Sequence, residues 1–133
     1  MQIDDPAVVA EVRSVFDRYE AALMANDIAV LDELFWADPR TVRFGVAELL
    51  YGHEAIRAFR ASVGSYPHRV NRRVVVTAFG ADFATTNLEF ERAGSGQVGR
   101  ETKIMARIPG AGWRIVTAHV SLLAGSDPAR AAR

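Results

Sequence analysis

Residues 69–91 read RVNRRVVVTAFGADFATTNLEFE, two runs rich in β-branched and aromatic residues on either side of Gly80-Ala81-Asp82. Residues of these types favour β-strands, and a short Gly-containing segment between two such runs is typical of a hairpin turn. The stretch therefore predicts an antiparallel hairpin formed by residues 69–79 and 83–91.

Two more segments of the same kind follow this hairpin. Residues 98–108 and 113–123 are again rich in Val, Ile, Thr or aromatic residues, and the Gly-containing residues 93–96 and 109–112 precede them. Gly and Pro in such positions favour tight turns. We therefore expect a four-stranded antiparallel meander in the second half of the chain.

The first half begins with the period of an amphipathic helix. Apolar residues recur every three or four positions between Pro6 and Asn26, and Asp4 or Asp5 can cap the helix start. Tyr19 lies on the apolar stripe. We expect this helix to pack its apolar side on the sheet.

Shorter elements are expected between the long helix and the meander. One is a helix at residues 53–61, with Ile56, Phe59 and Arg60 along one side. The others are a helix at residues 28–35 and short strands at residues 41–45 and 48–51.

This order of elements predicts an α+β fold. Helices come first and a long, strongly bent antiparallel sheet follows, so the helices cover one face of the sheet. A curved sheet closed by a long helix leaves a conical space, and we expect a pocket there. The chain of 133 residues is expected to form one domain over residues 1–124, with a flexible tail at 125–133.

The composition argues against several classes of protein. Lys and Arg together number 16, as do Asp and Glu, so nucleic acid is not expected as a partner. The sequence has no cysteine, no secretory signal and no apolar run long enough for a membrane span. We expect a cytoplasmic protein without cofactor and without membrane contact. The three histidines lack the spacing of a metal site, so no metal is expected.

One charge stands in the first short strand, Thr41-Val42-Arg43-Phe44-Gly45. Strand alternation places Arg43 on the face of Thr41, opposite Val42 and Phe44. On an inner face the guanidinium needs a carboxylate, from a ligand or from the protein, whereas on an outer face it is only a solvated charge. The internal candidates for this partner are Glu48, Glu89 and Glu101.

Tyr19 is the second candidate, because it lies on the apolar side of the first helix and therefore faces the same expected pocket as Arg43. The pKa of a free tyrosine is near 10. To act as a base at neutral pH, Tyr19 would need a pKa lower by about 3 units, and a single neighbouring cation does not readily lower it that far. We therefore expect Tyr19 to act as a hydrogen-bond donor or acid. The alternative is a core aromatic whose hydroxyl has only a structural partner.

Phe90 and His119 are the further candidates for substrate contact. Phe90 lies on the more apolar face of its strand, opposite Glu89 and Glu91. In the last strand, the inward face is expected to hold Val116, Ala118, Val120 and Leu122. Alternation then turns His119 outward, where it would contact a second subunit of a dimer instead of a substrate. The outward face of this strand is then Trp113, Ile115, Thr117, His119 and Ser121.

A basic cluster, Arg69, Arg72 and Arg73, begins the first long strand. Because the chain is neutral and no aromatics interleave with these arginines, we interpret the cluster as a solvated strand end.

These residues together resemble a known family. The pattern of elements, Tyr51-Gly52 before the helix with Ala55-Ile56, and residues 112–121 (GWRIVTAHVS) resemble the SnoaL-like, nuclear-transport-factor-2-like superfamily. Residues 35–36, 41–45, 82–85 and 113–121 are similar to its AtzH-like subgroup, small proteins associated with amidases of oxalurate and cyanuric acid breakdown. Residues 100–105 read RETKIM, where that family usually has a glutamine-rich run ending in tryptophan.

The resemblance implies a cone-shaped barrel, a homodimer, a small carboxylated urea-like substrate, and roles for Tyr19 and Arg43. On that basis we expect hydrolysis, or decarboxylation, of a substrate bound through Arg43, with Tyr19 as donor or acid. The alternative is a non-catalytic accessory subunit or ligand-binding module that partners an amidase.

Overall fold

The structure is a computed structural model that describes residues 1–126. Its elements confirm the α+β class, and their bounds lie within two residues of the predicted ones. They are α1 (Pro6–Ala25), α2 (Ile28–Leu34), β1 (Val42–Phe44), β2 (Leu49–Tyr51), α3 (His53–Ser62), β3 (Arg69–Phe79), β4 (Phe83–Arg92), β5 (Val98–Ile108) and β6 (Gly112–Leu122). Most of the predicted tail, residues 127–133, lies outside the described residues.

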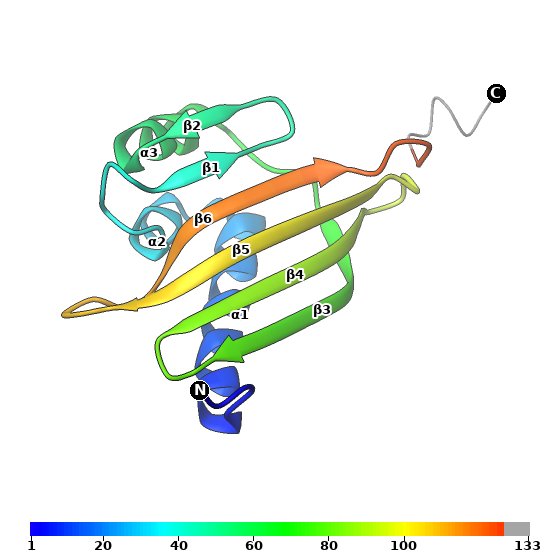
Figure 1. The fold of residues 1–133 in the computed structure, drawn as a ribbon. Helices are drawn as coiled ribbons and strands as arrows, with labels where there is room; N and C mark the ends of the chain where they lie inside the picture. Colours follow the sequence, from blue (N-terminus) through cyan, green and yellow to red (C-terminus); the bar gives the residue numbers. More distant parts are fainter. Residues whose placement is uncertain (127–133) are drawn as a thin grey trace.

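The strands form one six-stranded sheet with the order β2-β1-β6-β5-β4-β3. Strands β3 to β6 are the predicted antiparallel meander, and β1 joins β6 in parallel. Figure 1 shows the sheet curving over α1, with α2 and α3 beside β1 and β2. The sheet remains open because β2 and β3 form its two edges.

Local chemistry fixes both ends of α1. The Asp5 carboxylate accepts a hydrogen bond from the backbone N–H of Ala7 at 2.9 Å, and Pro6 occupies the first turn. At the other end Asn26 adopts a left-handed conformation with φ of 49°. Its side-chain amide donates to the carbonyl of Gly64 at 3.0 Å, which ties the end of α1 to the segment after α3. None of the helices in residues 1–126 is both long and apolar enough to span a membrane.

The inner face of the sheet, the face that meets α1, carries the core. Val12, Ala84, Met105 and Ile115 are buried there together. A second cluster of buried residues comprises Phe16, Leu88, Phe90 and Val120.

A β-bulge in β6 corrects the predicted faces of that strand. The register moves from Ile104 opposite Thr117 to Met105 opposite Ile115, so Val116 is left unpaired. Residues before the bulge therefore change face. Trp113 and Ile115, which were predicted to face outward, are buried with 6% and 0% of their surface exposed.

A bulge at Arg72 in β3 corrects the prediction for Arg69. Asn71 lies opposite Phe90 and Arg73 opposite Glu89, so Arg72 is the extra residue. The bulge reverses the alternation and turns Arg69 onto the inner face. Its side chain is 8% exposed and is not part of a solvated strand end.

Candidate functional site

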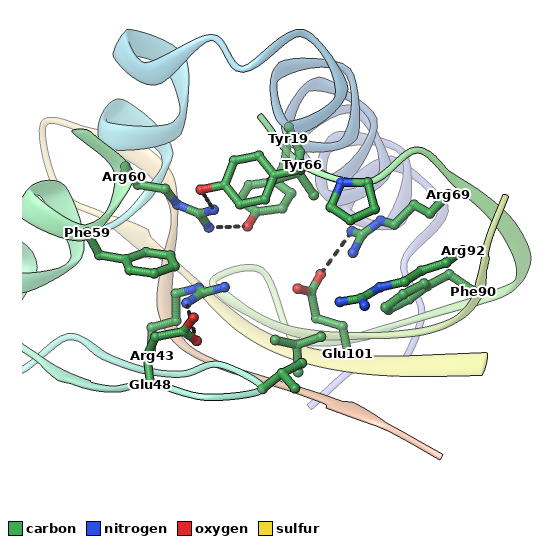
Figure 2. Close-up of a pocket in the computed structure, with 14 residues that line it drawn as sticks. Tyr19, Arg43, Glu48, Phe59, Arg60, Tyr66, Arg69, Phe90, Arg92 and Glu101 are labelled. Atoms are coloured by element: carbon green, nitrogen blue, oxygen red, sulfur yellow. Dashed lines mark hydrogen bonds and ion pairs between the residues drawn. The ribbon is translucent and has the colours of Figure 1, made fainter. Parts of the chain in front are cut away.

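A cavity of ≈ 130 Å³ lies between α1, α3 and the inner face of the sheet (Figure 2). Its lining includes charged and hydroxyl groups from six elements and two connecting segments. Those that carry the argument are Tyr19, Arg43, Arg60, Tyr66, Arg69 and Glu101.

Arg43 lies on the inner face, as predicted from strand alternation. Thr41 and Arg43 are 0% and 7% exposed, whereas Val42 and Phe44 are half-buried on the other face. The nearest carboxylate is that of Glu48, with 3.7 Å between Nη1 of Arg43 and its Oε2. Within residues 1–126, however, this Nη1 is buried without a hydrogen-bond partner. The guanidinium also lies over the ring of Phe59, 5.0 Å from its centre.

Arg60 is the most deeply buried charge of the site. Its surface is 0% exposed, and it donates to two phenol oxygens, from Nη2 to Tyr19 at 2.6 Å and from Nη1 to Tyr66 at 2.7 Å. Among the described residues no carboxylate pairs with it, and its Nε has no hydrogen-bond partner. A buried charge without a counter-charge is unfavourable, and an anion in the cavity would compensate it.

Arg60 determines how the hydroxyl groups of Tyr19 and Tyr66 can form hydrogen bonds. A guanidinium only donates, so the oxygen of each hydroxyl accepts and its proton remains available to a third group. Figure 2 shows both hydroxyls beside Arg60 at the same end of the cavity. Tyr19 and Tyr66 are therefore suited to donate to an oxygen or nitrogen of a ligand.

The opposite end of the cavity holds a network of four charges. Arg69 makes a two-point contact with Glu20, from Nε at 3.1 Å and from Nη2 at 2.5 Å, and its Nη2 lies 3.5 Å from Oε1 of Glu101. Lys103 donates to the same Oε1, and its Nζ is 3.9 Å from the centre of the Tyr19 ring. Every cation here has a carboxylate, unlike Arg60.

Glu101 is ionised at neutral pH. Burial by itself raises the pKa of its carboxyl group, but the charges of Lys103, Arg69 and Arg43 and the hydrogen bond from Lys103 lower this pKa from 4.5 to about 2. The group is therefore a hydrogen-bond acceptor and not a proton source.

Comparison with known proteins agrees with the resemblance noted from the sequence. The profile of the AtzH-like family matches residues 1–126. The chain belongs to the AtzH-like family. No curated protein matches it.

Two solved structures are similar over nearly their whole length. A cystatin-like fold protein from Burkholderia xenovorans LB400 is 47% identical, with a TM-score of 0.89 over 93% of this chain and 98% of that one. A protein of unknown function from the DUF3225 family of Pectobacterium atrosepticum SCRI1043 is 49% identical, with a TM-score of 0.88 over 92% and 95% of the two chains.

A more distant structure shows the fold alone. It is an NTF2-like protein of unknown function from Pseudomonas putida KT2440, 20% identical, with a TM-score of 0.73 over 88% of this chain and 87% of that one. This AtzH-like chain therefore shares the fold of that protein.

Of the residues predicted from the sequence, the fold brings Tyr19, Arg43 and Phe90 to one cavity. Phe90 lies under the guanidinium of Arg69, 4.4 Å from its carbon to the ring centre. His119 is not in that cavity. It is exposed on the outer face of the sheet, with its ring 5.6 Å from that of Phe44.

Arg60, Tyr66 and Lys103 are site residues that the sequence reasoning did not select. Arg60 was placed beside Ile56 and Phe59, and a charge on that apolar side was the available signal. Lys103 lies two residues after Glu101 on β5, so both side chains point to the inner face, where they are 1% and 5% exposed. Tyr66 follows α3 in a segment without regular structure, and no periodicity marks it.

The described residues offer no candidate metal centre. Within residues 1–126, no group of three or more His, Asp or Glu side chains is arranged to hold a metal ion.

Proposed function

We propose that this AtzH-like protein binds a small carboxylated, urea-like compound in the cavity and hydrolyses it. The observation that carries the proposal is Arg60, a buried cation without a carboxylate, joined to two hydroxyl donors. A ligand carboxylate supplies the missing negative charge, and the volume of the cavity restricts it to a small molecule.

Arg43 is the group that fixes this carboxylate in the proposal. Its Nη1 has no hydrogen-bond partner within residues 1–126 and lies beside the cavity. The planar guanidinium matches the two oxygens of a carboxylate, and charge-assisted bonds of this kind are the strong ones.

Tyr19 supplies the proton. Water adds to the carbonyl carbon, the C–N bond breaks, and Tyr19 gives its proton to the departing nitrogen and regains one from the water. At a urea carbonyl the products are a carbamate and an amine or ammonia, and the carbamate then breaks down to CO₂ and the second amine or ammonia. Release of CO₂ from an N-carboxylate is the variant reaction and uses the same delivery of a proton to nitrogen.

The direct test is turnover by the purified protein alone. Oxalurate and N-carbamoylglycine are supplied, and ammonia and CO₂ are measured. We expect Tyr19→Phe and Arg43→Gln to lower kcat/KM by about 10²-fold or more. The matched controls are Tyr51→Phe, 65% exposed, and Arg13→Gln, with a half-exposed side chain. Unchanged turnover in both site variants would contradict the reaction.

The second candidate function is an accessory subunit or ligand-binding module for an amidase. Large apolar side chains are exposed on the outer face, the face turned away from α1, and they support self-association under either candidate. The residues are Leu49, Tyr51, Val75 and Phe83, which are 40–72% exposed. A second copy of the chain is our proposed occupant of this face, in a cytoplasmic homodimer.

These two candidates differ in a measurable way. An enzyme releases product alone, whereas an accessory subunit is silent alone and changes the rate of an added amidase. Light scattering at micromolar concentration measures the proposed dimer, and Phe83→Glu is expected to dissociate it.

A further inference from the structure

Glu48 reaches the cavity from its solvent side. It lies on the turn between β1 and β2, residues 45–48, which also contributes Val46 to the lining. Val46 is 51% exposed. The side chain of Glu48 is 28% exposed, whereas the side chain of Arg43, 3.7 Å away, is only 9% exposed. Glu48 therefore stands between the buried guanidinium and solvent.

The contact between Glu48 and Arg43 is an ion pair without a hydrogen bond. The distance of 3.7 Å joins Oε2 of Glu48 to Nη1 of Arg43, and within residues 1–126 this nitrogen has no hydrogen-bond partner. The same oxygen accepts a long hydrogen bond from the backbone N–H of Ala47, with 3.4 Å between oxygen and nitrogen. Figure 2 shows the guanidinium between the ring of Phe59 and the carboxylate of Glu48. A partly exposed ion pair of this kind is weak, so Glu48 can leave Arg43 at small cost.

Gly45 provides the space for this carboxylate. A Cβ at residue 45 would lie 1.7 Å from Oε2 of Glu48 and 2.8 Å from its Cδ. Gly45 is not among the residues of positive φ, so its backbone conformation does not require glycine. Its N–H donates to the carbonyl of Glu48 at 2.9 Å and closes the turn. The missing side chain at residue 45 is therefore what lets the Glu48 carboxylate lie beside Arg43.

A ligand carboxylate bound by Arg43 would meet the like charge of Glu48. The ring of Phe59 covers one face of the guanidinium, and Nη1 is the nitrogen left for a ligand. A ligand oxygen bonded to Nη1 then lies beside Oε2 of Glu48. Two carboxylates this close disfavour each other's ionised form. Glu48 must therefore move away or take up a proton when the ligand binds.

We infer that Glu48 is a gate on Arg43. In the empty cavity its carboxylate neutralises the guanidinium, and it moves out toward solvent, still ionised, when a ligand carboxylate takes its place. The turn is followed by β2, a three-residue strand at the sheet edge, and segments with few buried contacts move at low cost. This inference rests on the proposed function and adds how access to Arg43 is controlled.

Calorimetry with N-carbamoylglycine measures the gate. We expect Glu48→Gln to bind this ligand about 3- to 10-fold more tightly than the wild type, because the competing charge is removed while the size of the side chain is kept. Glu54→Gln, an exposed acid on α3 outside the cavity lining, is the matched control and should bind as the wild type does. Equal binding by Glu48→Gln would overturn the gate. Weaker binding would also overturn it and make Glu48 a positioning residue for Arg43.

Gly45 tests the place of the carboxylate separately from its charge. Gly45→Ala should displace Glu48 and tighten binding as well. In a Glu48→Ala background the same substitution should change the affinity by less than about twofold, since no carboxylate remains to be displaced. An equal effect of Gly45→Ala in both backgrounds would show that residue 45 acts on Arg43 directly, which contradicts the gate.

The proton balance separates displacement of Glu48 from its protonation. Calorimetry in two buffers of different ionisation heat counts the protons taken up on binding. A displaced Glu48 stays ionised, so the wild type and Glu48→Gln should take up the same number. An additional proton in the wild type would show that Glu48 remains beside the ligand and would overturn the gate, with the carboxylate site left in place. If neither protein binds N-carbamoylglycine, the carboxylate site of the proposed function is refuted and the inference falls with it.

Discussion

Arg60 on α3 donates a 2.6 Å hydrogen bond to the hydroxyl of Tyr19 on α1, across 41 positions of sequence. The contact joins two helices at one end of the cavity. It fixes Tyr19 as a donor, because the phenol oxygen is already occupied as an acceptor. The hydroxyl oxygen of Tyr66 accepts a second hydrogen bond, from Nη1 of the same guanidinium, at 2.7 Å.

The same substitution should lower the stability of the fold far more at Lys103 than at Arg60. Lys103→Met leaves Glu101 buried without its closest partner and should destabilise the fold by about 3–5 kcal/mol. Arg60→Met leaves no carboxylate without its partner and should lower the stability by no more than about 1 kcal/mol. Urea unfolding of both variants measures this difference. A larger loss in Arg60→Met than in Lys103→Met would show that Arg60 is structural.

Tyr66 should contribute to ligand binding without contributing a large share of stability. Tyr66→Phe keeps the ring beside Arg60 but removes one of the two hydroxyl donors, so affinity for N-carbamoylglycine should fall by about 3- to 10-fold. Calorimetry measures it, with Tyr51→Phe as the control. Equal affinities in the wild type and Tyr66→Phe would exclude a role for that hydroxyl.

The stability of the protein should fall in acid through Glu101. Its pKa is about 2 in the folded state against a usual 4.5, so the native state holds the proton less tightly than the unfolded state. This stabilisation is present above about pH 4.5 and is lost as the pH falls toward 2, by roughly 3 kcal/mol. Urea unfolding at pH 6.5 and pH 3 should show a smaller difference for Glu101→Gln than for the wild type. Identical differences in the two proteins would contradict this assignment.

Gly99 should be intolerant of a side chain because Phe90 occupies the space. A Cβ at residue 99 would lie 2.1 Å from Cζ of Phe90, a core residue that also contacts Arg69. Gly99→Ala should therefore lower the stability by about 1–3 kcal/mol and displace the Phe90 ring. Gly64→Ala is the matched control, since nothing lies within 4 Å of its Cβ position. Thermal unfolding compares the two, and equal melting temperatures would show that the ring moves freely.

The sequence by itself determined the elements and the direction of Arg43. Periods of 3.6 and 2 are local properties, so they predicted each helix and strand to within two residues. The alternation around Thr41 also placed Arg43 on the inner face, where it is 7% exposed. That short strand contains no bulge, so its alternation is not interrupted.

Only the tertiary structure decided how the site is completed. The bulges at Arg72 and Val116 each reverse the faces of a strand, and they depend on pairing with a neighbouring strand rather than on a residue's own preference. They bring Arg69 inward and bury Trp113. Arg60 meets Tyr19 because α1 and α3 end side by side, where Asn26 bonds to Gly64. A local period carries no information about contacts over such separations, so the charge balance of the cavity emerges only when the chain is folded.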